Sequence, residues 1–246
     1  MKAMIFAAGL GTRLKPFTDN NPKALAKINN MTLLQHSINY LQQYGINDVI
    51  VNVHHFADKI ETLLQEQNGF GSNISISNER SEVLETGGGL KKAAHFFENE
   101  EAFVVLNVDV LTDLNLNKMI AAHRQRNVIG TLAVMDRVSS RKLLFDGEMY
   151  LAGWEHINTG ERRIARETSC YYPYAFSGIQ VLSPKVFEDM PFEGKFSLID
   201  VYLRLAVKHK LWGYNHTGDV FIDVGKPESI AKAEILFGQG TSKKQV

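Results

Sequence analysis

The chain opens with the apolar run Ala3-Met4-Ile5-Phe6-Ala7-Ala8, which passes directly into Gly9-Leu10-Gly11-Thr12-Arg13. A short continuous apolar run that ends in glycines is typical of a strand buried on both faces of a parallel sheet. Glycines after such a strand let backbone N–H groups converge on an anion, because no Cβ blocks the approach. The opening therefore predicts a buried strand over Ala3–Ala7 and an anion-binding loop directly after it.

The alternation of strand and helix patterns continues through the first half of the chain. Short runs rich in Val and Ile, typical of strands, alternate with longer stretches that carry apolar residues at helical spacing. This rhythm predicts right-handed crossovers and a mostly parallel sheet covered on both faces. Helices are expected from Thr32 to about Gly45, over Phe56–Gln65 and over Gly88–Phe97, and strands over Asp48–Val53, Asn73–Ser77 and Ala102–Leu106.

After about residue 128 the strand candidates lie closer together, and the Asp146-Gly147 pair is typical of a hairpin turn. We expect an α/β fold in one domain over residues 1–238, with a flexible tail over 239–246. Its first part covers about 1–127, and a smaller lobe with antiparallel strands covers about 128–238. Strands are expected over Val128–Met135, Lys142–Phe145, Tyr150–Trp154, Tyr174–Leu182 and Val220–Ile222, and helices over Ser197–Val207 and from Pro227.

The composition is that of an ordinary globular protein. The 246 residues include 27 basic and 27 acidic side chains, 44% hydrophobic residues and one cysteine. A net charge of zero attracts neither nucleic acid nor an anionic membrane, and no apolar stretch approaches the ~18–20 residues that span a bilayer. One cysteine can form neither an intramolecular disulfide nor a cysteine-rich zinc site. We expect a cytoplasmic enzyme, a monomer or small homo-oligomer, without nucleic acid or membrane as a partner.

Two cations accompany the glycine loop. Arg13 lies within it and Lys23 follows it, and both side chains can reach phosphate oxygens. Pro22 restricts Asn21 to extended geometry and so fixes how Lys23 is presented. The loop lacks the third glycine of a dinucleotide fingerprint and the Gly-Lys-Ser/Thr of a P-loop. These residues predict a phosphate site of another kind.

Asp109 and Asp223 each follow an apolar strand. Ligands bind at the carboxyl ends of strands in open α/β sheets, although either aspartate alone would be more typical of a turn or a helix cap. Together with a phosphate loop, they predict oxygen ligands for Mg²⁺, which prefers one or two carboxylates plus substrate phosphate. We therefore expect Mg²⁺ as the cofactor.

The pattern Gly-x-Gly-Thr-Arg-x4-Thr-x3-Pro-Lys, from Gly9 to Lys23, resembles the signature of the sugar-1-phosphate nucleotidylyltransferases. The resemblance implies a Rossmann-like three-layer sandwich whose first part binds a nucleoside triphosphate and whose smaller lobe binds a sugar-1-phosphate. It implies that Arg13 holds the triphosphate and Lys23 lies against the reacting phosphate. Val108 departs from the family, which usually has a glycine before the first aspartate. The implied catalytic residues are Arg13, Lys23, Asp109 and Asp223, of which both aspartates bind the metal, and the implied nucleotide-binding residues are Ala8, Gly9, Gly11, Thr12, Arg13, Lys23, Glu85, Gly87, Gly88 and Asp109.

Leu84-Glu85-Thr86-Gly87-Gly88-Gly89 resembles the same stretch of bacterial N-acetylmuramate-1-phosphate uridylyltransferases, a branch of that family. The chemistry favours the other base, because the Glu85 carboxylate is an acceptor and guanine offers two donors on one edge. If uracil is the base, the N–H groups of Gly87 and Gly88 are expected to donate to its carbonyl oxygens. Both alternatives stay open, and the resemblance favours uracil.

Ser177, Gly178 and Lys195 lie in segments that resemble the sugar-phosphate side of the family's site, and Lys195 is expected as a cation for the sugar phosphate. The stretch from Gly153 to Tyr172, with Arg162, Arg163 and Arg166, departs from the relatives, and we interpret it as an insertion. Contact of these arginines with an acidic substrate is one alternative, and a charged surface loop is the favoured one. The Glu-Lys-Pro of hexose-1-phosphate thymidylyltransferases is absent, which argues against a plain glucose substrate.

The sequence thus predicts an Mg²⁺-dependent enzyme that joins a nucleoside triphosphate and a sugar-1-phosphate and releases pyrophosphate. The narrower expectation is uridylyl transfer to N-acetylmuramate-1-phosphate in cell-wall recycling. A mannose-1-phosphate or heptose-1-phosphate guanylyltransferase is the alternative within the class. A non-catalytic nucleotide-sugar sensor is the alternative outside it, and such a protein would be expected to lose Arg13, Lys23 or one aspartate, none of which is lost.

Overall fold

The structure of the chain, a computed structural model, describes residues 1–190 and 193–238, so the tail expected over 239–246 lies outside the described residues. No helix in the described ranges is long and apolar enough to cross a membrane. The helices are α1 (Leu33–Gln42), α2 (Ala57–Glu66), α3 (Glu85–Lys92), α4 (Leu116–Arg126), α5 (Leu198–Ala206) and α6 (Pro227–Gly238). The strands are β1 (Lys2–Phe6), β2 (Lys27–Ile28), β3 (Met31–Thr32), β4 (Asp48–Val53), β5 (Asn73–Asn78), β6 (Phe103–Asn107), β7 (Val110–Thr112), β8 (Gly130–Met135), β9 (Arg141–Phe145), β10 (Leu151–His156), β11 (Glu161–Ile164), β12 (Tyr172–Leu182), β13 (Leu211–Asn215) and β14 (Phe221–Asp223).

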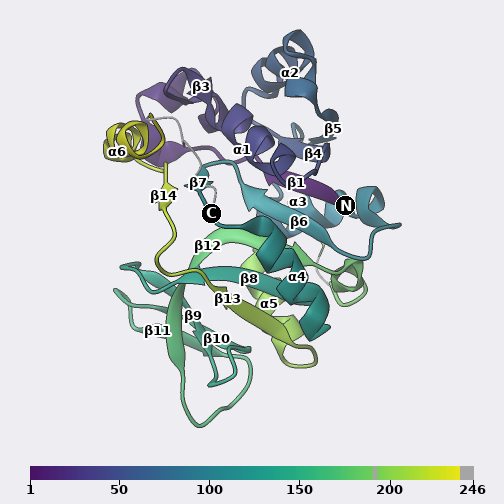
Figure 1. Cartoon of the computed structure of the whole chain (residues 1–246), viewed down its shortest axis with the longest axis vertical. Helices are drawn as coiled ribbons and strands as arrows, with labels where there is room; N and C mark the ends of the chain where they lie inside the picture. The colour runs from purple at the N-terminus through teal and green to yellow at the C-terminus, as the bar shows by residue number, and fades with distance from the viewer. Residues whose placement is uncertain (191–192, 239–246) are drawn as a thin grey trace, which may run out of the picture.

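The main sheet has the order β11-β10-β9-β12-β6-β1-β4-β5, and β8 joins it through β12 with β13 beyond (Figure 1). β6, β1, β4 and β5 are parallel, and their register places Asn52 and Asn107 on either side of Phe6. β12 runs antiparallel to β6 and also pairs with β8 and β9 of the second lobe. The expected α/β fold, with a mostly parallel central sheet and a lobe that contains antiparallel strands, is confirmed.

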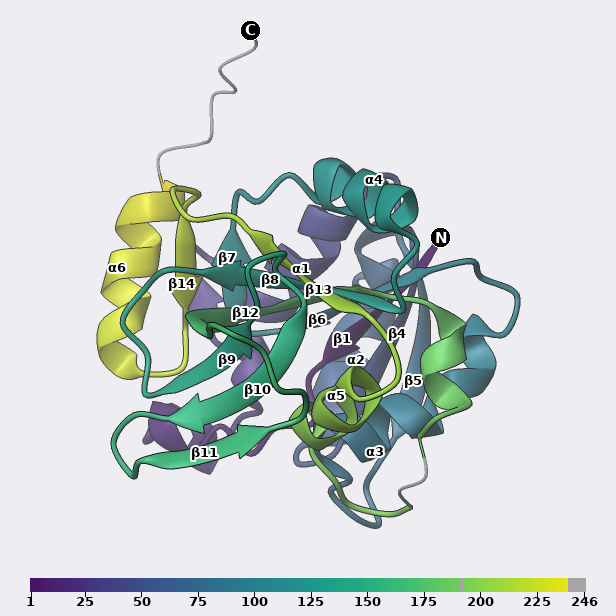
Figure 2. The same cartoon turned by 90° about the horizontal axis from the view of Figure 1, so that it is seen from below.

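Alternate residues of the central strands face two separate cores, and this produces the three layers. Ala3 and Ile5 of β1 pack with α1, α2 and α4, whereas Met4 and Phe6 pack with α3 and α5. Figure 2 shows α1 and α4 on one side of the sheet and α3 and α5 on the other. The central strands β1, β4 and β6 are mostly apolar because helices cover both of their faces.

Local caps set the helix ends. Thr32 Oγ1 accepts a 3.1 Å hydrogen bond from the Gln35 amide, so Thr32 caps α1 and the helix begins one residue later.

The helix expected over Gly88–Phe97 is wrong in its bounds. α3 begins at Glu85 and ends at Lys92, and a 3₁₀-helix over residues 94–97 follows it. The glycines of this region therefore lie inside the first turns of a helix.

The stretch 153–172 was expected to be a charged surface loop; its residues 157–164 are exposed as expected, but the stretch is not a loop. It contains the end of β10, all of β11 and the start of β12, and β10 and β11 form an antiparallel hairpin. The arginines of this stretch have partners inside the lobe: Arg162 lies 4.5 Å from the Tyr171 ring, Arg163 pairs with Asp200 at 2.7 Å, and Arg166 pairs with Asp146 at 2.6 Å.

Candidate active site

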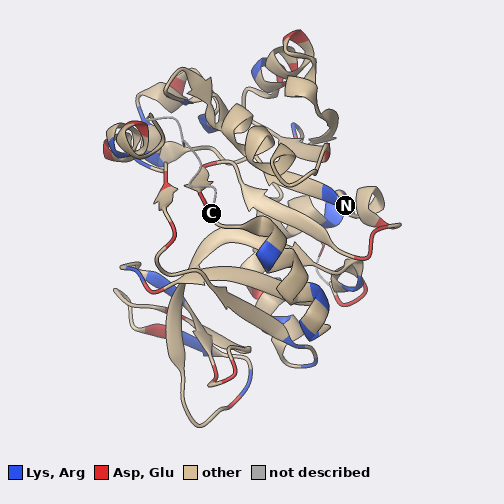
Figure 3. Ribbon diagram, in the orientation of Figure 1, with Lys and Arg blue, Asp and Glu red and all other residues tan. Residues whose placement is uncertain are grey.

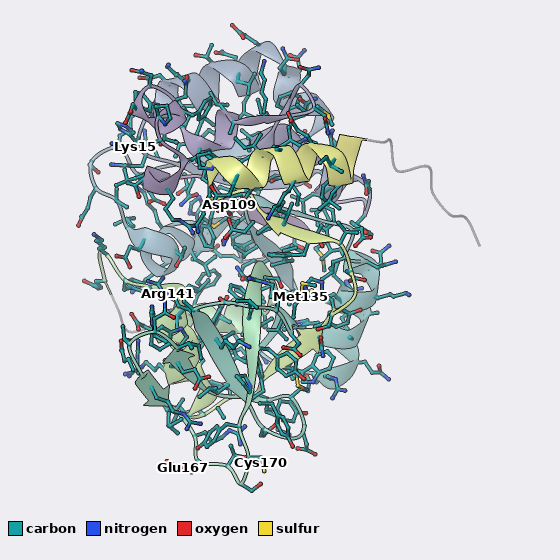
Figure 4. All side chains as sticks on the ribbon, turned by 90° about the vertical axis from the view of Figure 1, so that its left-hand side faces the viewer. Lys15, Asp109, Met135, Arg141, Glu167 and Cys170 are labelled. Carbon is teal, nitrogen blue, oxygen red and sulfur yellow. The ribbon has the colours of Figure 1, made fainter. Side chains whose placement is uncertain are left out.

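The loops after β1, β4, β5 and β6 enclose a cavity of about 270 Å³ at the carboxyl ends of the parallel strands, where ligands bind in this class of fold. Figure 4 shows Asp109 near the middle of the molecule, between the first part and the second lobe. Gly87 and Gly88 are not part of the cavity lining, in contrast to the other expected nucleotide-binding residues. Those in the lining are Ala8, Gly9, Gly11, Thr12, Arg13, Lys23, Glu85 and Asp109.

Gly11 is the position at which the phosphate loop requires a glycine. Its φ of 62° lies in the left-handed region, and a Cβ there would lie 2.9 Å from Thr18 Cγ2 and 3.0 Å from Lys23 Cβ. The Thr18 hydroxyl donates to the Gly11 carbonyl oxygen at 3.0 Å and closes the loop. Gly11 thus allows Lys23 to pack against the loop. A Cβ on Gly9, by contrast, would meet no atom within 4 Å.

Asn52 and Glu79 form a buried pair beneath the loop, and the sequence analysis missed both. Asn52 Oδ1 accepts from the amides of Ala7 at 2.7 Å and Ala8 at 3.3 Å, and its Nδ2 donates to Glu79 Oε1 at 2.8 Å. Glu79 Oε2 accepts from the Leu84 amide at 3.3 Å, and burial raises the pKa of this carboxyl group. The pair ties the start of the phosphate loop to the loop before α3. A single amide side chain within the apolar run of β4 was the signal, because buried amides need partners.

Three of the four expected catalytic side chains, those of Arg13, Lys23 and Asp109, line the cavity, and the fourth, Asp223, lies near Arg13. Lys23 Nζ donates a hydrogen bond to Asp109 Oδ2, and the two side chains are only 11% and 17% exposed. Asp223 ends β14, which pairs antiparallel with β7, the strand that follows Asp109. Arg13 Nη2 lies 4.0 Å from Asp223 Oδ2. Strand pairing therefore brings together residues from both ends of the chain.

Asp223 is the carboxylate whose titration the site perturbs. Desolvation and the neighbouring Asp109 carboxylate raise its pKa, and the charges of Lys23 and Arg13 offset part of that rise. A Cβ on Gly225 would lie 2.6 Å from Asp223 Oδ1 and 2.8 Å from Arg13 Nη2, so a glycine here lets these two side chains approach each other. Each of the two carboxylates thus has a cation beside it, Lys23 beside Asp109 and Arg13 beside Asp223.

Gly87 and Gly88 were expected to donate their N–H groups to a base, and this is wrong for the structure described. Both amides donate to the carbonyl oxygen of Phe196, at 2.9 and 3.3 Å. A Cβ on Gly87 would lie 2.4 Å from the Phe196 ring, and a Cβ on Gly88 would lie 2.2 Å from the Gly194 carbonyl oxygen. These glycines therefore allow the loop around residue 195 to pack directly on the first turn of α3.

Residues 2–143 match the model of the family described as Nucleotidyl transferase. The chain belongs to the nucleotidyl transferase family. The N-acetylmuramate alpha-1-phosphate uridylyltransferase of Caulobacter vibrioides is 31% identical over 96% of this chain and 97% of that protein. The protein of the same name from Neisseria meningitidis serogroup B is 27% identical over 97% of this chain and 99% of its own. The catalytic subunit beta of mannose-1-phosphate guanylyltransferase from Xenopus tropicalis is 28% identical over 99% of this chain and 66% of that protein.

Solved structures agree with this membership. HddC from Yersinia pseudotuberculosis, complexed with GMP-PN, superposes with a TM-score of 0.76 at 27% identity and covers 96% of this chain and 99% of that one. A UDP-glucose pyrophosphorylase complexed with UDP-glucose has a TM-score of 0.78 at 16% identity, covers 96% and 98% of the two chains, and shares the fold. The expected Rossmann-like fold is confirmed, and the chain is a sugar-1-phosphate nucleotidyltransferase.

This nucleotidyltransferase has a second cavity, of about 550 Å³, between the first part and the second lobe. Arg13 and Asp223 are part of its lining, and Arg13 also lines the first cavity. Phe176 belongs to the segment that was expected on the sugar-phosphate side, and it lines this second cavity. From the second lobe and the start of α5 come Arg137, Ser139, Ser140, Arg141, Lys142, Leu143, Trp154, His156, Phe176 and Ile199.

Ser177, Gly178 and Lys195, which were expected on the sugar side, are not among the residues that line either cavity of the nucleotidyltransferase. Ser177 is 1% exposed, and its Oγ shares a 2.8 Å hydrogen bond with His216 Nε2 behind the cavity wall. Gly178, with a φ of 72°, packs against Asn107, because a Cβ there would lie 2.8 Å from the side-chain amide. Lys195 Nζ lies 3.7 Å from the Oε1 atom of Glu85, a residue that lines the first cavity.

Proposed function

We propose that this nucleotidyltransferase transfers a uridylyl group from UTP to N-acetylmuramate-1-phosphate in the cytoplasm, with Mg²⁺ as its cofactor, in the recycling of cell-wall sugars. The observation that carries the proposal is the likeness, over nearly the full length of both chains, to two N-acetylmuramate alpha-1-phosphate uridylyltransferases at 31% and 27% identity. The Leu84–Gly89 stretch, which resembles that branch of the family, supports the same proposal.

The proposed reaction requires no general base from the protein. A sugar-1-phosphate has a second pKa near ~6, so its attacking oxygen is largely ionised at neutral pH. The protein has to hold that oxygen in line with the leaving pyrophosphate and to offset the charge of the phosphates. We assign the α-phosphate to Lys23, which is largely buried beside Asp109, and the β- and γ-phosphates to Arg13, which is more exposed at the rim.

Asp109 and Asp223 would hold the Mg²⁺ ion. In the part of the chain that the structure describes, no group of three or more His, Cys, Asp or Glu residues could hold a metal by itself. Two carboxylates suit Mg²⁺, which is usually held by one or two carboxylates and by substrate phosphate. The repulsion that helps to raise the pKa of Asp223 is one that a bound cation relieves. When bound, the ion would neutralise charge on the triphosphate.

A guanylyltransferase is the second candidate, and two observations favour it. HddC complexed with GMP-PN is similar to this chain over 96% of its length. Apart from Asp109, the first cavity is lined by two carboxylates, Glu79 and Glu85, and a carboxylate suits the paired N–H donors on one edge of guanine. The acceptor would then be mannose-1-phosphate or heptose-1-phosphate.

Pyrophosphate release from a grid of substrates tests the proposal. UTP, GTP, CTP and dTTP are each combined with the 1-phosphates of N-acetylmuramate, N-acetylglucosamine, mannose, heptose and glucose, with Mg²⁺ or with excess EDTA. We expect the fastest turnover with UTP and N-acetylmuramate-1-phosphate, and none in EDTA. Faster turnover with GTP and a mannose or heptose acceptor would replace the proposal by the second candidate.

A further inference from the structure

We infer that the acceptor sugar-1-phosphate carries a second anionic group, and that Arg141 binds this group in the second cavity. The inference rests on the proposed function in one respect, namely that this cavity receives the acceptor. It does not depend on which base the nucleotide carries. The chemistry that the site would recognise is a carboxylate or a further phosphate on the sugar.

Part of the lining of the second cavity is apolar and aromatic, as in sites that bind a sugar ring. In the register of β9 and β10, Leu143 lies opposite Trp154, and Arg141 lies opposite His156 at the neighbouring position of the same face. Phe176 of β12 also lines the cavity. Apolar and aromatic side chains of this kind cover the ring, and a few polar groups at the edge then determine which substituents fit.

The lining of the cavity carries an excess of positive charge. Arg13, Arg137, Arg141 and Lys142 face a single carboxylate, that of Asp223. Within residues 1–190 and 193–238, no carboxylate lies within 4.0 Å of the charged groups of Arg137, Arg141 or Lys142. The neighbouring hairpin differs, because there Arg163 and Arg166 have carboxylate partners at 2.7 and 2.6 Å. Figure 3 shows basic residues along the β9–β11 part of the lobe.

Arg137 and Arg141 have different surroundings. Arg137 Nη2 donates to the Phe176 carbonyl oxygen at 2.9 Å, and its guanidinium lies 4.7 Å from the Phe221 ring. Burial lowers the pKa of Arg137, and the charge of Asp223 offsets part of that fall. Arg141 is exposed, and only its backbone is held: Ser139 Oγ donates to its carbonyl oxygen at 2.9 Å and accepts from its amide at 3.3 Å. Arg137 is thus fixed at the reacting end, whereas the guanidinium of Arg141 is available to a ligand.

A neutral sugar-1-phosphate would leave Arg141 without a counter-charge. Its only phosphate has to reach the reacting centre, where Arg13, Lys23 and Arg137 already provide positive charge. Figure 4 shows Arg141 on the second lobe, below Asp109. A guanidinium binds a carboxylate or a phosphate through two parallel hydrogen bonds, which gives it both strength and geometric selectivity. A second anion on the sugar is therefore the group that Arg141 fits.

The test compares matched pairs of acceptors in the wild type and in Arg141→Gln. N-acetylmuramate-1-phosphate and N-acetylglucosamine-1-phosphate differ by an ether-linked acid, glucuronate-1-phosphate and glucose-1-phosphate by a carboxylate, and glucose-1,6-bisphosphate and glucose-1-phosphate by a phosphate. We expect the wild type to have a higher kcat/KM for the acidic member of at least one pair. In Arg141→Gln that preference should fall by roughly 10- to 100-fold, the worth of a charge-assisted hydrogen bond. The pair with the largest fall identifies the second anion as a carboxylate or a phosphate.

Arg162→Gln is the matched control, because it removes one positive charge from the same lobe at a side chain outside the cavity lining. It should leave the preference unchanged, and Arg141→Lys should retain part of it. If Arg141→Gln lowers kcat/KM equally for acidic and neutral acceptors, Arg141 binds the shared 1-phosphate and the inference is wrong. A wild type without preference for any acidic member would also overturn it. Preference for GTP would contradict the proposed function alone, since each pair can be measured with whichever nucleotide is used.

Discussion

The amide of Val224 donates a 2.8 Å hydrogen bond to the carbonyl oxygen of Asp109. This bond continues the pairing between β7, which follows Asp109, and β14, which ends at Asp223. The carboxylates of the two aspartates are consequently close enough for each charge to raise the energy of the other. Strand pairing between distant segments therefore brings the two aspartates together, and the repulsion between their carboxylates helps to raise the pKa of Asp223.

We expect Asp223→Asn to abolish turnover and to leave the Tm of the protein in EDTA unchanged or higher. Desolvation and the Asp109 carboxylate raise the pKa of Asp223, so the charged form of this carboxyl group is less favourable in the folded protein than in the unfolded chain. The substitution removes that charge and a proposed metal ligand together. Pyrophosphate release and thermal melting measure the two effects. Near-normal activity in saturating Mg²⁺ would show that the two-carboxylate metal site is wrong.

We expect Lys23→Ala to lower kcat more than it raises KM. Lys23 is largely buried beside Asp109, and a cation at the α-phosphate acts mainly when charge develops there in the transition state. Arg13→Ala should change both constants, because Arg13 is assigned to the leaving pyrophosphate. Lys15→Ala is the matched control in the same loop, since Lys15 pairs with Asp19 in solvent. An effect of Lys23→Ala on KM alone would contradict its assignment.

The elements that local pattern determines could be predicted from the sequence. The strand expected over Asp48–Val53 has the bounds of β4. A short apolar run with polar residues at its ends can be recognised from the local sequence, without knowledge of distant contacts. α4 was missed, although Leu116, Met119, Ile120 and His123 lie at helical spacing and are all buried. Its other positions are mostly polar or basic, and the apolar stripe is correspondingly narrow.

The phosphate loop could be found because its residues are contiguous, whereas the two ends of the substrate site could not. The roles of Gly87 and Gly88 depend on Phe196, a residue about a hundred positions away whose contact no local pattern reveals. The cavity around Arg141 depends on the register of β9, β10 and β12. In both cases the spacing of residues in the sequence carries no information on the pairing that brings them together.

We expect Glu85→Gln to leave the preference for UTP over GTP largely intact. The Glu85 side chain is 46% exposed and its carboxylate lies 3.7 Å from Lys195 Nζ. Solvent and the charge of Lys195 therefore weaken any hydrogen bond that this carboxylate accepts from a base. Lys195→Gln is the matched control, because it breaks the same pair from the other side. The ratio of kcat/KM for the two nucleotides measures the effect. A wild type that prefers GTP and loses about 10- to 100-fold of that preference in Glu85→Gln would show that Glu85 reads guanine.

Glu79 should make the stability of the protein depend on pH. Burial raises the pKa of its carboxyl group above the ordinary 4.5, although the hydrogen bond from Asn52 offsets part of the rise. A carboxyl whose pKa rises on folding stabilises the fold below its unfolded pKa, and that contribution is lost as the pH rises through the folded pKa. Glu79→Gln does not titrate, so the Tm of the wild type relative to this variant should be highest near pH ~4 and fall towards neutral pH.

Thermal melts from acid to neutral pH measure this difference. Glu82→Gln is the matched control, because Glu82 is exposed in the same loop. It should follow the wild type at every pH. A difference between the wild type and Glu79→Gln that grows as the pH rises would contradict the prediction.

Gly88→Ala and Gly9→Ala should separate stability from nucleotide binding. A Cβ on Gly88 would lie 2.2 Å from the Gly194 carbonyl oxygen, a backbone atom that moves only with its loop, so we expect a loss of about 1–3 kcal/mol in unfolding free energy. A Cβ on Gly9 would meet no protein atom within 4 Å, yet Gly9 lines the nucleotide cavity. Gly9→Ala should therefore keep the wild-type Tm and raise KM for the nucleotide. Chemical denaturation and steady-state kinetics measure both. A destabilised Gly9→Ala, or a Gly88→Ala protein as stable as the wild type, would show that the two glycines have been assigned the wrong roles.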